Sequence, residues 1–284
     1  MLWKLPVGEL LSPSNSEILK VATEAIRVAG EIVIGVRERG MLDIRNKAAR
    51  DMVTTADLQA EAAIISIIKR HFPTHEFLAE EAASAKELNT QLGKGPLWII
   101  DPVDGTTNFA YGHPQVGISI GFALNGSVQA GAVFAPFQRE LFTAIKGKGA
   151  KLNGEPIGVS RTESLADALV CTGFPYVRDN VPRLMKLSSQ VLQNCRDLRR
   201  LGAASLDLCW VGAGRLDAYY ETVLPWDMAA GRLIAQEAGA TCGNFMPYSP
   251  DDPTPIDLRC DGLLVATPAV FEPLKELLVR SWKS

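Results

Sequence analysis

The sequence predicts a layered α/β protein in which helices cover the faces of β-sheets. Three observations lead to this class. The 284 residues are 47% apolar, which is enough to bury a sizeable core. Apolar residues near the N-terminus recur at helical spacing, whereas the middle of the chain holds short apolar runs bounded by glycine, proline or polar turns. In the last part of the chain such runs alternate with helical patterns, as they do when helices cover a sheet.

Two helices are expected near the N-terminus. Ser14 and Glu17 have the spacing of a capping box, and the apolar residues that follow keep helical spacing up to Gly40. A second helix is expected from about Thr55 to the residue before Pro73. Each helix has one apolar side, so each needs a surface to cover.

Four strands are expected next along the chain. They are the apolar runs at residues 76–80, 97–101, 116–124 and 127–135. Asn125 and Gly126 separate the last two runs and predict a tight hairpin turn.

A tract rich in glycine and lysine, residues 146–156, is the expected boundary between two lobes. The N-terminal lobe would span residues 1–150 and the C-terminal lobe residues 151–284. Within the C-terminal lobe, strand-like runs at 168–174, 216–221 and 262–267 alternate with helical patterns at about 181–195, 205–211, 227–237 and 269–282.

Composition excludes several classes of protein. The formal charge of −3, with no basic face, argues against a nucleic-acid polymer as partner. The five cysteines lack any C-x-x-C spacing, so neither a disulfide framework nor a zinc site is expected, and a reducing cytoplasm fits best. His71 and His75 flank Pro73, which argues against a zinc pair at helical spacing and favours solvent or core roles. No apolar run approaches the roughly 18 residues of a membrane helix, and the N-terminus lacks the apolar core of a signal peptide.

Acidic residues follow the expected strands at the points where layered α/β proteins bind ligands. Asp101 and Asp104 come after the buried run Trp98 to Ile100, and Glu80 ends another strand. Asp227 lies where a helix should begin. Carboxylates so placed suit Mg²⁺, which binds carboxylates, waters and substrate phosphate. The alternative for Asp101 and Asp104 is an Asx-turn that only bonds nearby amides.

Five motifs occur in the order that marks the inositol monophosphatase family, which the sequence resembles from about residue 15 to 275. They are DMVTTAD (51–57), AEE (79–81), DPVDGTTNF (101–109), GAAS (202–205) and PWDMAAG (225–231). The resemblance implies a layered α-β-α-β-α fold of two lobes, usually assembled as a homodimer. It also implies Mg²⁺-dependent, lithium-sensitive hydrolysis of a phosphate monoester by direct attack of water.

Carried over motif by motif, the resemblance implies a ligand set for two to three Mg²⁺ ions. Glu80, Asp101 and the backbone carbonyl of Val103 would hold the first ion. The second would be held by Asp101, Asp104 and Asp227, and Glu80 would help to place a third ion through water.

The resemblance likewise implies the roles of catalytic and substrate-binding residues. Thr106 would pair with Asp57, and together with Glu80 they would orient and deprotonate the water. The alternatives are that Asp57 is only a first-turn acid on its helix and that Asp227 only caps its own. Backbone N–H groups of Gly105 and Thr106 are expected to bind phosphate oxygens.

Substrate contacts are expected from Asp104, Gly105, Thr106 and Asp227, and, in the second lobe, from two further residues. The resemblance implies that Glu221 accepts hydrogen bonds from ring hydroxyls and that Ala204 lines the pocket. Glu221 lies six positions before Asp227, one fewer than in the family pattern. This shorter spacing leaves open whether the Glu221 carboxylate reaches the substrate hydroxyls.

Two other features of the sequence depart from or add to this pattern. Ala79 stands where the family usually has glycine, and no loss of metal binding is expected from it. Strand alternation predicts that one of Tyr219 and Tyr220 lies in the core. The cysteines are expected to be small core residues.

The leading hypothesis is a Mg²⁺-dependent phosphatase of inositol monophosphate or a related polyol phosphate. Alternatives within the same chemistry are histidinol phosphate, fructose 1,6-bisphosphate and 3′-phosphoadenosine 5′-phosphate. The last would require several lysines or arginines, and no such cluster is visible near the motifs. A non-catalytic binding protein is a further alternative, although such a protein would normally have lost one of these acids or Thr106.

Overall fold

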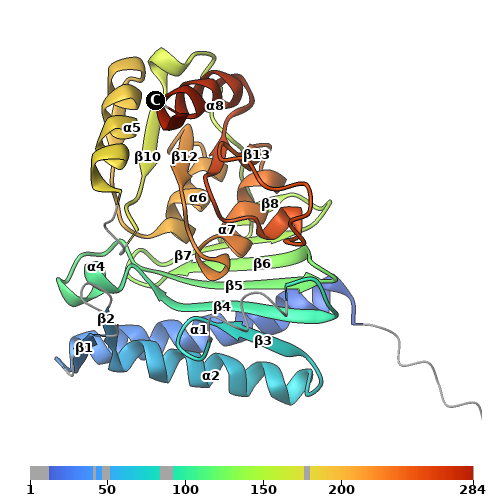
Figure 1. The fold of residues 1–284 in the computed structure, drawn as a ribbon. Coiled ribbons are helices and arrows are strands. Elements are labelled where there is room, and N and C mark those ends of the chain that lie inside the picture. The colour runs from blue at the N-terminus through green and yellow to red at the C-terminus, as the bar shows by residue number, and fades with distance from the viewer. Residues whose placement is uncertain (1–12, 41–42, 47–51, 84–91, 176–179, 284) are drawn as a thin grey trace, which may run out of the picture.

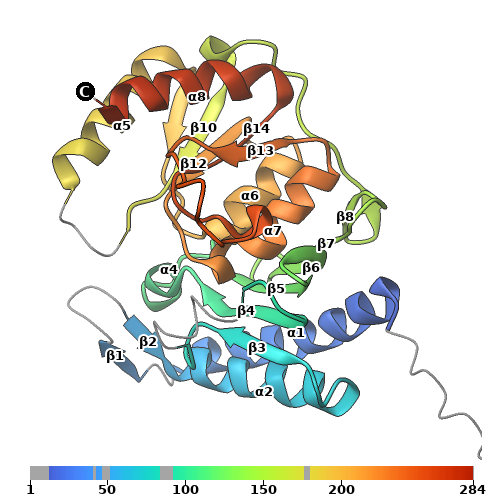
Figure 2. The ribbon, with the colours of Figure 1, turned by 45° about the vertical axis from the view of Figure 1, so that its right-hand side comes forward.

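Five layers make up the protein in the computed structural model, which describes residues 13–40, 43–46, 52–83, 92–175 and 180–283. Two N-terminal helices cover one face of a first sheet, two helices lie between this sheet and a second sheet, and two more cover the outer face of the second sheet (Figures 1 and 2). Four clusters of buried apolar side chains fill the spaces between successive layers. This α-β-α-β-α order confirms the expected fold class.

The helices agree closely with the expected positions. The described α-helices are α1 (Asn15–Glu38), α2 (Thr55–His71), α4 (Thr106–Ala110), α5 (Val181–Asn194), α6 (Ala204–Gly212), α7 (Pro225–Glu237) and α8 (Pro268–Lys283). Two short 3-10 helices, η1 (Leu165–Asp167) and η2 (Ile256–Leu258), lie in connections. Ser14 and Glu17 form the predicted capping box, with the Glu17 carboxylate accepting from the Ser14 N–H at 2.8 Å.

The first sheet has the order β3-β4-β5-β6-β7-β8-β9. Its strands are β3 (Glu76–Ala79), β4 (Pro96–Asp104), β5 (Gly117–Leu124), β6 (Ser127–Ala135), β7 (Glu140–Ile145), β8 (Ala150–Leu152) and β9 (Glu155–Pro156). The predicted hairpin turn between β5 and β6 is confirmed, since Asn125 and Gly126 have φ angles of 51° and 79°. The tract at 146–156 contains β8 and β9, which extend this sheet, and the division of the chain into lobes near residue 150 stays a prediction.

The second sheet has the order β11-β10-β12-β14-β13. Its strands are β10 (Leu169–Thr172), β11 (Asp197–Arg199), β12 (Ala218–Glu221), β13 (Thr241–Asn244) and β14 (Leu263–Ala266). A separate antiparallel pair, β1 (Ile44–Asn46) and β2 (Met52–Thr54), precedes α2. The sequence did not predict β1, β2, β7, β8, β9, β11 and β13, because most of these strands are too short to show an apolar alternation of their own.

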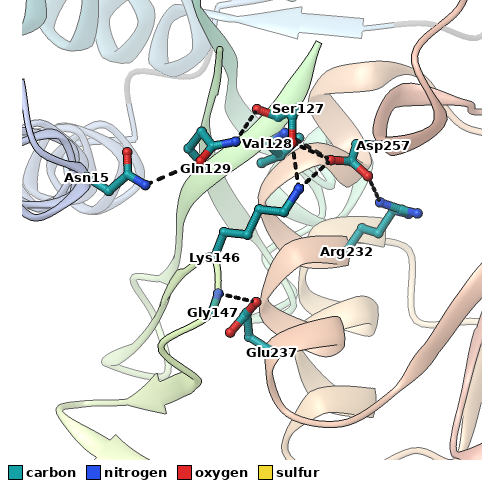
Figure 3. A network of polar contacts seen from close by, with 9 residues as sticks. All are labelled: Asn15, Ser127, Val128, Gln129, Lys146, Gly147, Arg232, Glu237 and Asp257. Atoms are coloured by element: carbon teal, nitrogen blue, oxygen red, sulfur yellow. Dashed lines mark hydrogen bonds and ion pairs between the residues drawn. The ribbon is translucent and has the colours of Figure 1, made fainter. Parts of the chain in front are cut away.

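Helix α7 is attached to the first sheet by polar contacts (Figure 3). The Asp257 carboxylate accepts from the Val128 N–H at 3.1 Å and forms an ion pair with Arg232 at 3.2 Å. Near the end of α7, Glu237 accepts from the N–H of Gly147 at 2.8 Å. These contacts fix the helix whose first turn carries Asp227.

His75 and the cysteines lie in or beside the core, with Cys171 and Cys209 buried and the other three cysteines half-buried. His75 accepts a hydrogen bond from the Trp98 indole at 3.0 Å and stacks on Phe72, with ring centroids 4.7 Å apart, so it has a core role. All five cysteines are unpaired. Among the described helices, none combines the length and apolar character required to cross a membrane.

Candidate active site

Acidic side chains from four elements gather at the ends of β3 and β4. The two strands are parallel, and the Glu80 N–H, just beyond β3, donates to the Ile100 carbonyl at 3.1 Å, so Glu80 lies beside the end of β4. Burial raises the pKa of Asp101 well above its usual value, and the nearby charges of Glu80, Asp104, Asp227 and Asp57 raise it further. The structure therefore brings together all the acids that the sequence singled out as metal ligands or catalytic groups.

Asp101 is the centre of this cluster and is only 1% exposed. Its Oδ1 accepts from the Val103 N–H at 3.0 Å, which is the Asx-turn weighed as an alternative. Because this bond uses one lone pair of one oxygen, the turn leaves acceptor capacity for a cation. The Val103 carbonyl, in turn, accepts from the Thr106 hydroxyl at 3.0 Å and keeps a second lone pair.

Asp104 joins the end of β4 to the beginning of α6. Its carboxylate accepts from the N–H of Ala204 at 3.1 Å and from the N–H and hydroxyl of Ser205 at 2.7 and 2.5 Å. Burial raises the pKa of Asp104 to about 6, against the lowering effect of these α6 donors. Ser205 was not singled out by sequence, although it ends the GAAS motif.

Asp57 and Thr106 meet across 49 positions of sequence, with the Thr106 hydroxyl 3.3 Å from Oδ1 of Asp57. The other carboxylate oxygen of Asp57 accepts from the N–H and the hydroxyl of Thr54 at 2.9 and 2.5 Å. Asp57 is thus the capping acid of α2 and also the neighbour of Thr106. The two interpretations offered by the sequence are compatible, because each uses a different oxygen.

Asp227 lies in the first turn of α7, where Oδ2 accepts from the Leu224 N–H at 2.7 Å. Burial raises the pKa of Asp227, and the charges of Asp104 and Glu80 raise it further. The helix-capping role weighed from sequence is therefore present, and it again uses one of two carboxylate oxygens.

The turn after Asp104 requires glycine. Gly105 has a φ of 89°, and a Cβ at this position would lie 3.0 Å from the carbonyl oxygens of both Gln115 and Gly202. Asn108 holds the same two segments together, because its side-chain amide donates to the carbonyls of Gln115 and Leu201, each at 2.8 Å. This clamp sets the start of α4 against the segment before α6, whose first residue is Ala204.

Glu221 lies at the end of β12 in the second sheet, whereas Glu80, Asp101 and Asp104 lie at the ends of β3 and β4 in the first sheet. Burial raises its pKa to about 7, against the lowering effects of the Tyr219 hydroxyl bond and the charge of Arg200. The charge of Asp104 also reaches Glu221, so the shortened spacing to Asp227 leaves it near the site. Tyr219 and Tyr220 point to opposite faces of the sheet as strand alternation predicts, but both are core residues, at 0% and 3% exposure.

The acid cluster fits a hard divalent cation in donor type and charge. All its side-chain donors are oxygens, and a cation would offset the like charges that raise the pKa values of Asp101 and Asp227. As the side chains stand, no three histidine, cysteine or acidic groups in the described part of the chain are close enough to hold an ion.

The fold and the acid cluster define a layered α/β protein with a buried, oxygen-lined candidate site at the ends of two parallel strands. The family model described as "Inositol monophosphatase family" matches residues 14–281. The chain is 38% identical over 276 residues to an inositol-1-monophosphatase of a Synechocystis species, covering 95% of this chain and 91% of the relative. It is also 38% identical over 231 residues to the Nus factor SuhB of Pasteurella multocida, covering 80% of this chain and 85% of that protein.

A solved structure of an inositol monophosphatase from Anabaena superposes with a TM-score of 0.80 at 35% identity, covering 93% of this chain and 96% of the other. The chain therefore belongs to the inositol monophosphatase family and is a phosphatase of that family.

Proposed function

We propose that this protein is a Mg²⁺-dependent phosphatase of polyol phosphate monoesters, with inositol 1-phosphate as the leading substrate. The observation that supports the proposal is the gathering of acids around Asp101 beside the hydrogen bond between Asp57 and Thr106. A phosphate dianion repels an approaching nucleophile, so a site for its hydrolysis needs compensating positive charge. A buried acid cluster suits cations that would supply this charge.

In this proposal Glu80, Asp101 and the Val103 carbonyl would hold one Mg²⁺ ion, and Asp101, Asp104 and Asp227 a second. Glu80 would place a third ion through water. When bound, the ions offset the repulsion between nucleophile and phosphate, lower the pKa of water and stabilise the leaving oxygen. Lithium in the millimolar range should then inhibit hydrolysis by competing at the second position.

The chain's own residues would orient the water. In the reacting arrangement the single hydrogen of the Thr106 hydroxyl would go to Oδ1 of Asp57 rather than to the Val103 carbonyl, which would leave the oxygen lone pairs of Thr106 to accept a hydrogen from the water. Because Thr54 holds the other Asp57 oxygen, the acceptor is fixed in place. Glu80 would accept the proton that the water loses, and the N–H groups of Gly105 and Thr106 would bind phosphate oxygens.

On the leaving-group side, Glu221 would accept hydrogen bonds from hydroxyls of the polyol, and Ala204 would line the pocket. The charge of Asp104 acts on Glu221, and the charges of Glu80 and Glu221 both act on Asp227, so substrate and cations would share Asp104 and Asp227. The homodimer implied by family resemblance is part of the proposal, and light scattering of the purified protein would measure it.

The test is phosphate release from inositol 1-phosphate with and without Mg²⁺, beside histidinol phosphate, fructose 1,6-bisphosphate and 3′-phosphoadenosine 5′-phosphate. Preference for inositol 1-phosphate supports the proposal. Faster Mg²⁺-dependent hydrolysis of another compound would keep the chemistry and replace the substrate.

A binding function is the second candidate, because relatives 36–40% identical to this chain are named as Nus factors. The substitution Asp104→Asn separates the two. It should abolish hydrolysis if the protein acts as an enzyme, whereas a binding function would persist. Failure of the wild-type protein to hydrolyse any compound of the panel would favour binding.

A further inference from the structure

Arg200 is a basic residue at the candidate site to which no role has been assigned. It lies two positions before Gly202 and is exposed. Its guanidinium folds over the glycine, because a Cβ placed on Gly202 would lie 2.3 Å from Nη1 of Arg200. The adjacent Arg199 differs, since its guanidinium forms an ion pair with Asp197 at 2.5 Å. Among the described residues, no acid forms such an ion pair with Arg200.

The guanidinium of Arg200 therefore lies close to the turn expected to bind phosphate. Gly202 is in contact with Gly105, since a Cβ on Gly105 would lie 3.0 Å from the Gly202 carbonyl oxygen. The Asn108 amide, which donates to the Leu201 carbonyl at 2.8 Å, holds this segment in place. The backbone that carries Arg200 is thus fixed, while its side chain keeps donors available at the surface.

A fixed acceptor lies at the same end of the second sheet, two strands away from this donor. Arg200 directly follows β11 and Glu221 ends β12, and β10 lies between these strands, with Cys171 paired to Arg199 on one side and to Tyr219 on the other. In keeping with this register, the charge of Arg200 lowers the pKa of Glu221. The Glu221 carboxylate is held from two sides, by the hydroxyl of Tyr219 and by close packing against Gly173, where a Cβ would overlap Oε2 at 1.8 Å. A cation and an anion consequently lie at the same end of the second sheet, where the proposed function places the leaving group.

We propose that Arg200 is a specificity-determining residue that, together with Glu221, binds two neighbouring hydroxyl groups of the substrate. This inference rests on the proposed function and narrows its substrate class. A hydroxyl both donates and accepts, a guanidinium only donates and a carboxylate only accepts, so the pair matches two adjacent hydroxyls. A second phosphate at Arg200 would lie beside the Glu221 carboxylate and be repelled by it. The site therefore selects polyol monophosphates over sugar bisphosphates.

The experiment compares Arg200→Met with the matched control Arg199→Met, which removes the neighbouring arginine without touching the site. Both variants and the wild-type protein are assayed with Mg²⁺ on inositol 1-phosphate, on cyclohexyl phosphate, which has the ring without its hydroxyls, and on fructose 1,6-bisphosphate. Melting temperatures verify folding, which the exposure of both arginines favours.

For Arg200→Met, we expect KM for inositol 1-phosphate to rise about ten-fold, the loss typical of a hydrogen bond to a charged group, with kcat nearly unchanged. Its KM for cyclohexyl phosphate and all constants of Arg199→Met should stay within about two-fold of wild type. Equal changes on both ring substrates, or no change on inositol 1-phosphate, would overturn the inference. A larger loss on fructose 1,6-bisphosphate would also overturn it, because Arg200 would then bind a second anion. No hydrolysis of any compound by the wild-type protein would instead contradict the proposed function.

Discussion

Replacing Asp101 by asparagine should stabilise the metal-free protein and abolish its activity. Asparagine keeps the oxygen that accepts from the Val103 N–H at 3.0 Å, so the turn is preserved. It removes one negative charge from a side chain that is 1% exposed and whose pKa is raised by the charges of four other acids. The same charge is the one shared by both proposed cation positions.

The size of the two effects follows from these contacts. Relief of like-charge repulsion around one buried carboxylate is worth about 1–3 kcal/mol in folding free energy. For a chain of 284 residues the unfolding entropy is about 0.6 kcal/mol per kelvin, so the melting temperature in EDTA should rise by about 2–5 °C. Loss of cation binding should lower kcat by about 10³-fold or more, since metal ions supply several kcal/mol of transition-state stabilisation.

Thermal melting in EDTA measures the stability of the metal-free protein, and the change in melting temperature on adding Mg²⁺ measures cation binding. Wild-type protein should be stabilised by Mg²⁺, by about 2.7 kcal/mol at 100 times the dissociation constant, and Asp101→Asn should respond far less. Asp217→Asn is the control, because this buried aspartate accepts from the Leu169 N–H at 2.6 Å at the opposite end of β12 from Glu221. It should lose stability and keep the Mg²⁺ response. A variant at Asp101 that melts lower than wild type in EDTA, or responds fully to Mg²⁺, would refute the reasoning.

Two further predictions concern stability. Burial raises the pKa of Glu221 to about 7 from 4.5, so the folded metal-free protein should gain up to about 3 kcal/mol as pH falls from 8 through 7 towards 5. Glu221→Gln should be more stable than wild type at pH 8, and its free energy of unfolding should not show this increase as the pH falls. Parallel plots of the free energy of unfolding against pH for the two proteins would contradict the raised pKa of Glu221. Asp257→Ala should lower the free energy of unfolding by about 2–4 kcal/mol, because it leaves Arg232, whose side chain is 9% exposed, without its ion pair. Urea denaturation measures this, and Asp257→Ala combined with Arg232→Met should lose less than the single variant; a larger loss would be evidence against a buried unpaired charge.

The elements that the sequence predicted correctly are those whose signal is local. The capping box at Ser14 and the turn at Asn125 and Gly126 involve contacts within three residues, so their residue types alone are informative. The short strands β11 and β13 lack such a signal. They form because β10 and β14 offer free edges to pair with, which is a property of the assembled sheet.

In the candidate site too, some features follow from local sequence and others only from the tertiary structure. The sequence by itself determined which acids lie at strand ends and helix starts, since Glu80, Asp101 and Asp227 each follow from the apolar segment or helix beside them. Only the tertiary structure decided what those acids contact. The Asp104 bonds to Ser205 span 101 positions and the Asn108 bond to Leu201 spans 93. The nearness of Arg200 to Glu221 depends on the strand order β11-β10-β12 within the second sheet. Contacts of such separation carry no periodic pattern along the chain, because they arise only when the layers close upon one another.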